Sequence, residues 1–209
     1  MVYVEGGTFA MGADDSDAYS NEKPVHQESV GSFHIGKYEV TQKEWKAVMG
    51  SNPSNFNGDD LPVENVSWDD CQEFIKKLNK LTGQKFRLPT EEEWEYAARG
   101  GRYSNGYKYS GSNYIGEVAW YFDNSGMETH TVGTKSPNEL GLYDLSGNVW
   151  EWTSSHYSDN YNSPRNSSNF VNRGGCCGDD ARYCRVSNCD NDGRTRRNSG
   201  LGLRLALDN

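Results

Sequence analysis

Four of the five cysteines lie in one short segment near the C-terminus, "RGGCCGDDARYCRVSNCDNDGRTRRNSGLGLR", which spans residues 173–204. Thiols this close together could form a redox pair, a metal cluster or a disulfide. A zinc cluster needs CxxC-like spacing or neighbouring histidines. The adjacent pair Cys176–Cys177 has neither, and a disulfide between adjacent cysteines is strained. The spacing at this pair therefore favours none of these sites.

Two other cysteines are expected to be core side chains. Cys184 lies close to Val186 in "CRVSN", and Cys71 falls on the apolar side of a predicted helix. Free cysteines in such places behave as small buried hydrophobes. Cys176, Cys177 and Cys189 are then predicted to be surface or loop thiols without a chemical role.

Three helices with clear start signals precede this segment and must help to position it. Each begins with a capping box, in which a Ser or Thr side chain and an acidic side chain three residues later cap each other's backbone amides. The acids of "PTEEEWEYAARGG" are interpreted as favourable charges at a helix N-terminus and not as a catalytic pair. The three boxes pair Thr41 with Glu44, Ser67 with Asp70, and Thr90 with Glu93.

The second half of the chain has a different character. After Gly101, Gly, Asn, Ser and Tyr dominate and helical periodicity disappears. Short apolar runs between turn residues predict short strands, and "VYVEGGTFAMG" near the N-terminus predicts a strand, a glycine turn and a second strand. The sequence therefore predicts an α+β fold in a single domain over residues 1–209.

Composition argues against two classes of protein. The formal net charge is −9, whereas a nucleic-acid-binding protein needs a basic face to neutralise phosphates. No apolar run approaches the about 18 residues that indicate a membrane-spanning helix. We therefore expect no nucleic-acid partner and no transmembrane segment.

Five blocks of the sequence, taken in order, resemble the formylglycine-generating enzyme (sulfatase-modifying factor) family. They are "KYEVTQKEW", "LPVENVSWDDCQEF", "FRLPTEEEWEYAARGG", "GLYDLSGNVWEWT" and "NRGG…LGLRLAL". The resemblance implies a fold related to C-type lectins, with a small mixed β core, packed helices and much irregular backbone. For members with enzyme activity it also implies copper-dependent oxidation of a sulfatase cysteine by two cysteines five residues apart.

Cys184 and Cys189 have that separation but not that register. Counted forward from the "RGG" at 173–175, Cys184 takes the second catalytic position while Asp179 takes the first. Counted back from the "LGLR" at 201–204, neither position holds a cysteine, because the chain is shorter between the two anchors. We therefore predict that the protein is not an enzyme, with a copper-dependent formylglycine-generating oxidase acting on sulfatase cysteines as the alternative.

The same resemblance implies a structural Ca²⁺ site in "GLYDLSGNVWEWT". Its ligands would be the carboxylates of Asp144 and Glu151 and the carbonyl oxygens of Gly147 and Val149. Two carboxylates and two turn carbonyls form the oxygen-rich site that Ca²⁺ prefers. The alternative is a turn in which the two acids cap backbone amides. The predicted function requires no cofactor.

The composition between Cys176 and Gly200 is unusual. Lys, Glu, Gln, Trp and Met are absent there, although Lys and Glu are plentiful upstream. An AAC or AAT codon whose adenines are replaced at random yields every residue of this window and none of the five missing types. This pattern resembles the variable proteins of diversity-generating retroelements, a class that includes a surface-displayed Treponema lipoprotein with this lectin-like fold.

The resemblance implies a ligand-binding protein with a variable region at about 173–204. The partner would be a protein or another macromolecule, and we expect a monomer at the bacterial cell surface. It would be an outer-membrane lipoprotein whose leader is absent from this chain. Arg185, Val186 and the strand at 201–205 are predicted to be scaffold. The predicted ligand-facing residues are Cys177, Asp179, Asp180, Arg182, Tyr183, Asp190, Asn191, Asp192, Thr195, Arg196 and Asn198.

Overall fold

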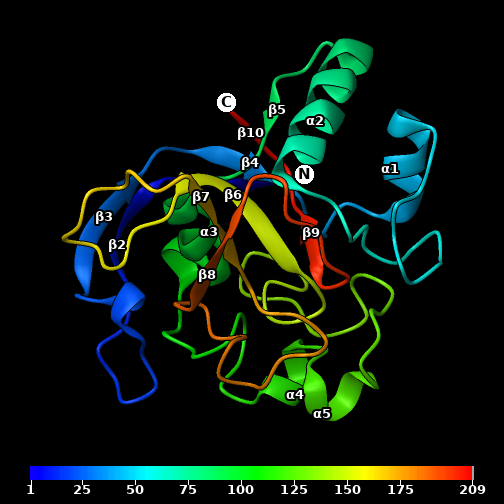
Figure 1. The fold of residues 1–209 in the computed structure, drawn as a ribbon. Coiled ribbons are helices and arrows are strands. Elements are labelled where there is room, and N and C mark those ends of the chain that lie inside the picture. Colours follow the sequence, from blue (N-terminus) through cyan, green and yellow to red (C-terminus); the bar gives the residue numbers. More distant parts are fainter. Residues whose placement is uncertain (209) are drawn as a thin grey trace.

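The computed structural model describes residues 1–208, in which short helices and strands alternate with long irregular segments (Figure 1). The strands are β1 (Val2–Val4), β2 (Gly7–Met11), β3 (His26–Val30), β4 (Phe33–Ile35), β5 (Phe86–Arg87), β6 (Trp150–His156), β7 (Asn169–Arg173), β8 (Cys189–Gly193), β9 (Leu201–Leu203) and β10 (Ala206–Asp208). The helices are η1 (Ser20–Glu22), α1 (Gln42–Met49), α2 (Trp68–Thr82), α3 (Glu91–Ala98), η2 (Gly101–Tyr103), α4 (Ile115–Val118) and α5 (Phe122–Ser125).

One sheet joins the two ends of the chain. Its strand order is β1-β4-β10-β5, so both the first and the last described strand pair with β4. Strands β2 and β3 form a separate hairpin. The two strands predicted in "VYVEGGTFAMG" are therefore present, but each pairs with a later strand and not with the other.

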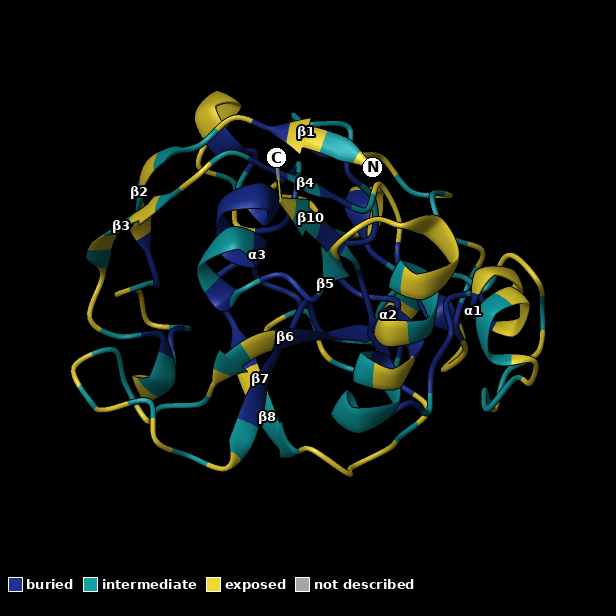
Figure 2. Cartoon of the chain, turned by 90° about the horizontal axis from the view of Figure 1, so that it is seen from above, coloured by how far each residue is buried: buried dark blue, intermediate teal, exposed yellow. Residues whose placement is uncertain are grey.

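The second four-stranded sheet positions the predicted site. Its order is β8-β7-β6-β9, with β6 and β9 parallel and the other neighbours antiparallel. Helix α3 packs against β6 and β7 and also against β2 and β3. Most of α3 is therefore dark blue in Figure 2, because it lies inside the molecule between these strands.

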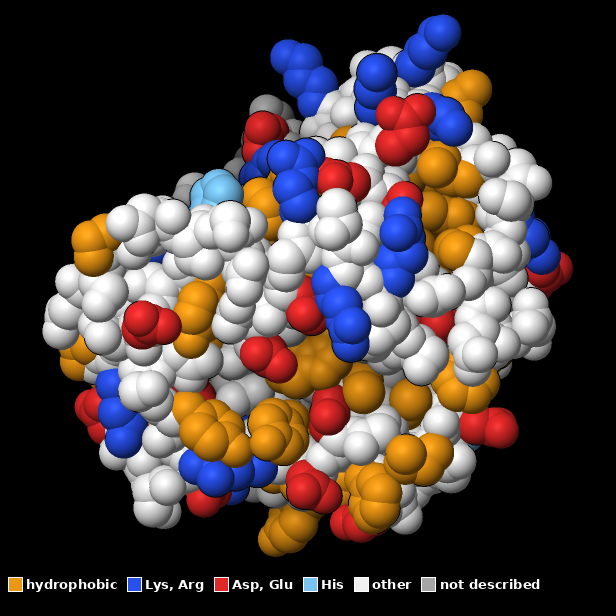
Figure 3. Space-filling view, viewed as in Figure 1, with side chains coloured by type: hydrophobic (Ala, Val, Ile, Leu, Met, Phe, Trp, Pro, Cys, Tyr) orange, Lys and Arg blue, Asp and Glu red, His pale blue; other side chains and the backbone are white. Residues whose placement is uncertain are grey.

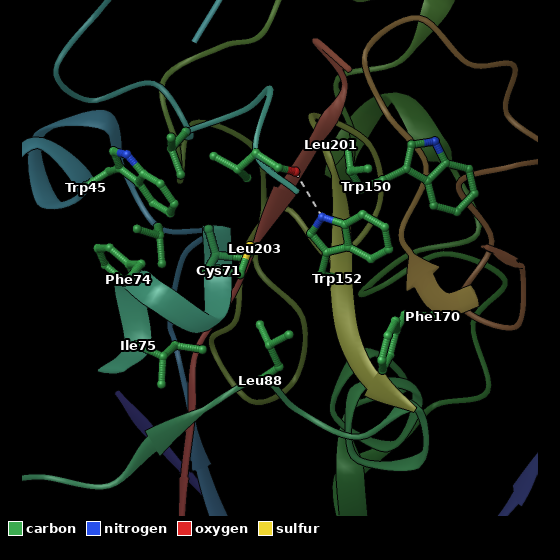
Figure 4. Close-up of a cluster of buried hydrophobic side chains, with 13 residues drawn as sticks. Trp45, Cys71, Phe74, Ile75, Leu88, Trp150, Trp152, Phe170, Leu201 and Leu203 are labelled. Carbon is green, nitrogen blue, oxygen red and sulfur yellow. Dashed lines mark hydrogen bonds between the residues drawn. The ribbon is translucent and has the colours of Figure 1, made fainter. Parts of the chain in front are cut away.

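The largest apolar cluster fills the space between α1, α2 and this sheet (Figure 4). The rings of Trp45 and Phe74 stack at 4.8 Å between centroids. Trp152 donates its indole N–H to the Val66 carbonyl at 3.0 Å, so its polar atom is satisfied inside the core. Cys71 belongs to this cluster with 0% exposure, which confirms its predicted place.

The three predicted capping boxes are all present. Thr41, Ser67 and Thr90 each accept a hydrogen bond from the backbone three residues on, and the acidic partners return it. The glycines after α1 and α2 adopt the left-handed conformation that ends a helix. Within residues 1–208, no helix has the length and apolarity to cross a bilayer.

Candidate ligand-binding surface

The predicted variable segment is attached to the second sheet at both of its ends. It begins at Arg173, where β7 ends, and it finishes in β9, which lies beside β6. Between these points β8 runs antiparallel to β7 as the edge strand. The segment thus forms two loops, residues 174–188 and 194–200, one before and one after β8 (Figure 1).

Arg173 fixes the first loop to α3. Its side chain is fully buried and forms ion pairs with Glu91 at 2.5 Å and Glu95 at 2.9 Å. The same guanidinium donates hydrogen bonds to the backbone carbonyls of residues 186, 187 and 188. Glu91, which we interpreted only as a charge at a helix start, is therefore one half of a buried ion pair.

Arg185 fixes the middle of the loop to η1. It donates two hydrogen bonds of 2.7 Å to the two carboxylate oxygens of Glu22, and both side chains are buried. Burial acts to raise the pKa of Glu22, but hydrogen bonds from Arg185 and the Tyr19 backbone outweigh it, so the pKa is lowered. Val186 is buried beside α3. The predicted scaffold role of these two residues is confirmed.

The residues predicted to face a ligand divide by burial. Cys177 is buried, with 4% exposure. Four are half-buried: Asp179, Asn191, Asp192 and Asn198. Six are exposed: Asp180, Arg182, Tyr183, Asp190, Thr195 and Arg196. The structure therefore brings most of the predicted set to the surface, but not all of it.

Two residues of the predicted ligand-facing set, Asp179 and Cys177, also have contacts with the scaffold. The Asp179 carboxylate accepts a hydrogen bond from the Trp150 indole at 2.7 Å. The Cys177 backbone donates to the Asn148 carbonyl at 2.9 Å and accepts from the Ser125 hydroxyl at 2.6 Å. The turn after β7 is thereby tied to β6 and α5, so these two residues hold the turn in place.

The side chains of β8 continue the surface beyond this loop. Asp190 is exposed, Asn191 accepts a hydrogen bond from Asn169 at 2.7 Å, and Asp192 lies 4.0 Å from Arg196. Figure 3 shows the same side of the molecule as Figure 1, with acidic and hydrophobic side chains interspersed over its middle and lower parts. The surface is polar, with apolar areas between the charges.

An aromatic group borders β8 on the side of η1. The rings of Tyr19 and Tyr183 stack at 6.1 Å between centroids, and the Arg182 guanidinium lies 3.8 Å from the Tyr19 ring centroid. Tyr19 is 154 positions upstream of Arg173, and nothing in its local sequence "DAYSNE" indicated a place beside the variable segment.

The second loop is tied to the start of α2 by two arginines outside the predicted ligand-facing set. Arg194 binds the two carboxylate oxygens of Asp69 at 2.6 and 3.1 Å, and Arg197 binds those of Asp70 at 2.7 and 2.8 Å. A guanidinium matches a carboxylate in this two-contact geometry, whereas an ammonium does not. The arginines of this segment therefore have partners that favour Arg over Lys.

The cysteine pair expected of an oxidase has unfavourable surroundings. Cys184 and Cys189 are both buried, and burial raises the pKa of both thiols. Thiol chemistry needs the thiolate, which these surroundings disfavour. Cys184 is a core side chain as predicted, but Cys189 is not the surface thiol that we expected. All five cysteines are free thiols.

Two of the predicted calcium ligands, Asp144 and Glu151, lie near the Arg204 guanidinium. Both carboxylate oxygens of Glu151 accept hydrogen bonds from Arg204, and one also accepts from the Trp94 indole. Asp144 keeps one buried oxygen without a partner among the described residues, and burial raises its pKa to about 6.

Arg204 thus supplies the positive charge beside these acids. Across residues 1–208, no group of three or more His, Cys, Asp or Glu side chains is arranged to hold a metal ion. In this arrangement both oxygens of Glu151 bind Arg204, so the Glu151 carboxylate is not available as a Ca²⁺ ligand. Calcium binding stays a prediction.

Comparison with known proteins gives one family and several relatives. The family model described as sulfatase-modifying factor enzyme 1-like domain matches residues 1–209. The solved structure of Treponema denticola variable protein 1 superposes with a TM-score of 0.92 and 33% identity, covering 100% of this chain and 95% of that chain.

Two further relatives are a chaperone and an enzyme. The chaperone protein LppX of Paenibacillus barcinonensis is 39% identical in an alignment 202 positions long, which covers 73% of this chain and 70% of LppX. The formylglycine-generating enzyme of Mus musculus is 27% identical in an alignment 284 positions long, gaps included, which covers 100% of this chain and 75% of the enzyme. Similarity of this kind therefore extends to a variable protein, a chaperone and an enzyme.

Proposed function

This chain belongs to the sulfatase-modifying factor family, and from that premise we propose that it is a non-enzymatic protein that binds a macromolecular ligand through the variable segment 173–204. One observation carries the proposal. Six of the predicted ligand-facing residues are exposed on a segment whose backbone is held by the buried side chains of Arg173, Arg185 and Arg204. Such a surface tolerates exchange of side chains without loss of the fold.

The likeness to Treponema denticola variable protein 1 supports this reading, because that chain aligns over the whole length of this one. The buried thiols at Cys184 and Cys189 weigh against the oxidase alternative. Oxygen uptake by the copper-loaded protein with a sulfatase-derived cysteine peptide, together with formation of an aldehyde, would establish that alternative and remove the proposal.

The experiment that tests binding is a display library. The six exposed positions are randomised with codons derived from Asn, and the library is selected against a folded protein such as lysozyme. We expect binders that remain folded, because exposed substitutions away from special features change stability by about ±0.5 kcal/mol or less each.

A control library randomises six exposed positions on α1 and on the part of α2 after Asp70, because only the start of α2 binds the variable segment. Equal numbers of binders from both libraries would contradict the proposal, since the variable segment would then have no special capacity. Loss of folding in most members of the first library would contradict it as well.

Diversification and location are part of the same proposal. We expect a near-identical, Asn-rich copy of the coding segment for residues 172–205 beside a reverse transcriptase gene, with differences only at adenines. Differences scattered over other bases would exclude that mechanism. We also propose display at the bacterial cell surface as a lipoprotein; full protection from protease added to intact cells would contradict this location.

A further inference from the structure

A recess of about 390 Å³ lies at the edge of the variable surface, between η1, the end of β6 and the start of β8. Its walls include three tyrosines, two asparagines and one acid: Tyr19, Tyr157, Tyr183, Asn21, Asn188 and Asp190. Three of these residues, Tyr19, Asn21 and Tyr157, lie outside the variable segment. The recess is therefore built partly from the scaffold and partly from the variable segment.

The two asparagines leave acceptor oxygens without partners. Asn21 uses its amide N–H to bind the Cys189 carbonyl at 2.9 Å, and Asn188 uses its own to bind Glu22 at 3.3 Å. The side-chain oxygen of each is buried and has no hydrogen-bond partner within residues 1–208. Buried acceptors of this kind are costly unless a donor reaches them.

The wall of the recess carries one acidic side chain. Asp190 lies on its wall and is exposed to solvent. Of the nearby cations, Arg185 is paired with Glu22. Arg182 lies against the Tyr19 ring and its Nε donates to the Asp17 carbonyl, so it keeps its positive charge. Asp190 itself has no ion-pair partner among the described residues. The recess thus combines aromatic rings, two amide oxygens without partners, and a carboxylate without an ion-pair partner whose Oδ1 accepts a hydrogen bond from the Asn191 amide at 2.8 Å.

We propose that this recess binds a primary ammonium group, the side chain of a lysine on a protein ligand. An ammonium has three N–H donors and no acceptor, which matches two amide oxygens and one carboxylate. Tyrosine faces attract cations, and Arg182 already occupies such a position on Tyr19. The inference rests on the proposed binding function and names the chemistry of one contact within it.

Because part of the recess belongs to the scaffold, the residues outside the segment would remain when the segment varies. Variants that keep an acid at position 190 would then share a preference for lysine-bearing ligands. A sugar could also stack on tyrosine rings, but it is neutral and would not use the charge of Asp190. The comparison of a charged with an uncharged probe separates these two ligands.

The test is an NMR titration of the ¹⁵N-labelled protein with Nα-acetyl-lysine methyl ester. We expect saturable shifts of the side-chain amide signals of Asn21 and Asn188. The Nα,Nε-diacetyl compound, which lacks the charge, and methyl α-mannoside are expected to cause no such shifts. Equal shifts with either neutral probe, or no shifts with the lysine ester, would overturn the proposal.

Two variants complete the experiment. Asp190→Asn is expected to weaken binding of the lysine ester about two- to fivefold, the effect of losing one partly exposed ion pair. Asp180→Asn removes the same charge from an exposed position that does not line the recess, and we expect unchanged affinity. Equal effects of the two substitutions would mean that only the overall charge matters, which would also overturn the proposal.

The outcomes are independent of the display experiment. If the library yields binders while the lysine ester causes no shifts, the binding function stands and the ammonium site is lost. If the ester binds but the library yields no binders, the site exists and the proposed function of the wider surface fails.

Discussion

Three buried arginines determine where the variable segment lies. Arg173, Arg185 and Arg204 are each at most 1% exposed and bind carboxylates of Glu91 and Glu95, Glu22, and Glu151, respectively. A guanidinium can satisfy several acceptors at once, as Arg173 does by donating to Glu91 and to three carbonyls while it forms an ion pair with Glu95. Arg185, which lies in the lysine-free window, therefore has a folding role that is independent of codon randomisation.

The first prediction concerns Arg173. Arg173→Met should lower the free energy of unfolding by about 3–5 kcal/mol, because it removes a buried guanidinium. Glu91 and Glu95 then keep only Arg165 and Arg99 as ion-pair partners, and three buried carbonyls lose their donor. Urea denaturation of the purified variants measures the change. The control Arg194→Met removes an ion pair whose arginine is 61% exposed, and should cost at most about 1 kcal/mol. Similar losses in both variants would show that the burial of Arg173 is not what anchors the loop.

At the scale of elements, the turn after β7 sets the direction of the first loop. Gly174 and Gly175 have φ angles of +101° and +73°, in the region that favours glycine. A Cβ atom on Gly175 would lie 2.8 Å from the Cys184 sulfur and 3.0 Å from the Tyr183 backbone. The "RGG" sequence therefore combines the buried anchor with a turn that has no room for a side chain.

The second prediction tests this turn. Gly175→Ala should destabilise the fold by about 2 kcal/mol or more, because a left-handed backbone and a close contact are both strained. Gly193→Ala is the matched control at the end of β8, where the nearest atom to an added Cβ is 3.7 Å away. We expect that change to stay within about 1 kcal/mol, measured by thermal unfolding of both variants. An equally stable Gly175→Ala protein would contradict the steric argument.

At the scale of the whole molecule, buried carboxyl groups make stability depend on pH. Burial raises the pKa of Glu64 to about 7 and of Asp144 to about 6. Burial, followed by the charges of Asp144 and Glu151, also raises the pKa of Glu39 well above its usual range. A raised pKa means that the folded state binds the proton more tightly than the unfolded chain, so these groups favour folding at lower pH.

The third prediction isolates Glu64. Its stabilising contribution is complete below the unfolded pKa of 4.5 and is lost as the pH rises through about 7. Glu64→Gln removes this titration, so the variant should gain on the order of 2 kcal/mol relative to the native protein between pH 5 and pH 8. Urea denaturation at both pH values measures this gain.

The control is Glu73→Gln, which removes a charge from the exposed side of α2. It reports the effect of one lost surface charge over the same pH interval. A stability difference between Glu64→Gln and the native protein that does not change with pH would show that Glu64 does not titrate in this window.

Much of the fold could be predicted from local sequence. The three capping boxes, the ends of α1 and α2 at glycines and the core place of Cys71 follow from contacts within a few residues or from one helical face. The exposed part of the variable segment could be predicted from its composition. In these cases the physical cause acts over a short stretch of chain, where spacing alone reveals it.

Only the tertiary structure decided the remaining features. Asp179 binds Trp150, Glu91 binds Arg173, and Tyr19 lies against Tyr183, over sequence separations of 29, 82 and 164 residues. Such contacts depend on which strands become neighbours in the sheets, and no local pattern marks them. The sequence by itself determined the family resemblance, the three capped helices and the segment that we predict to vary. Tertiary packing determined which side chains of that segment are anchors, which reach solvent, and which scaffold residues form a recess with them.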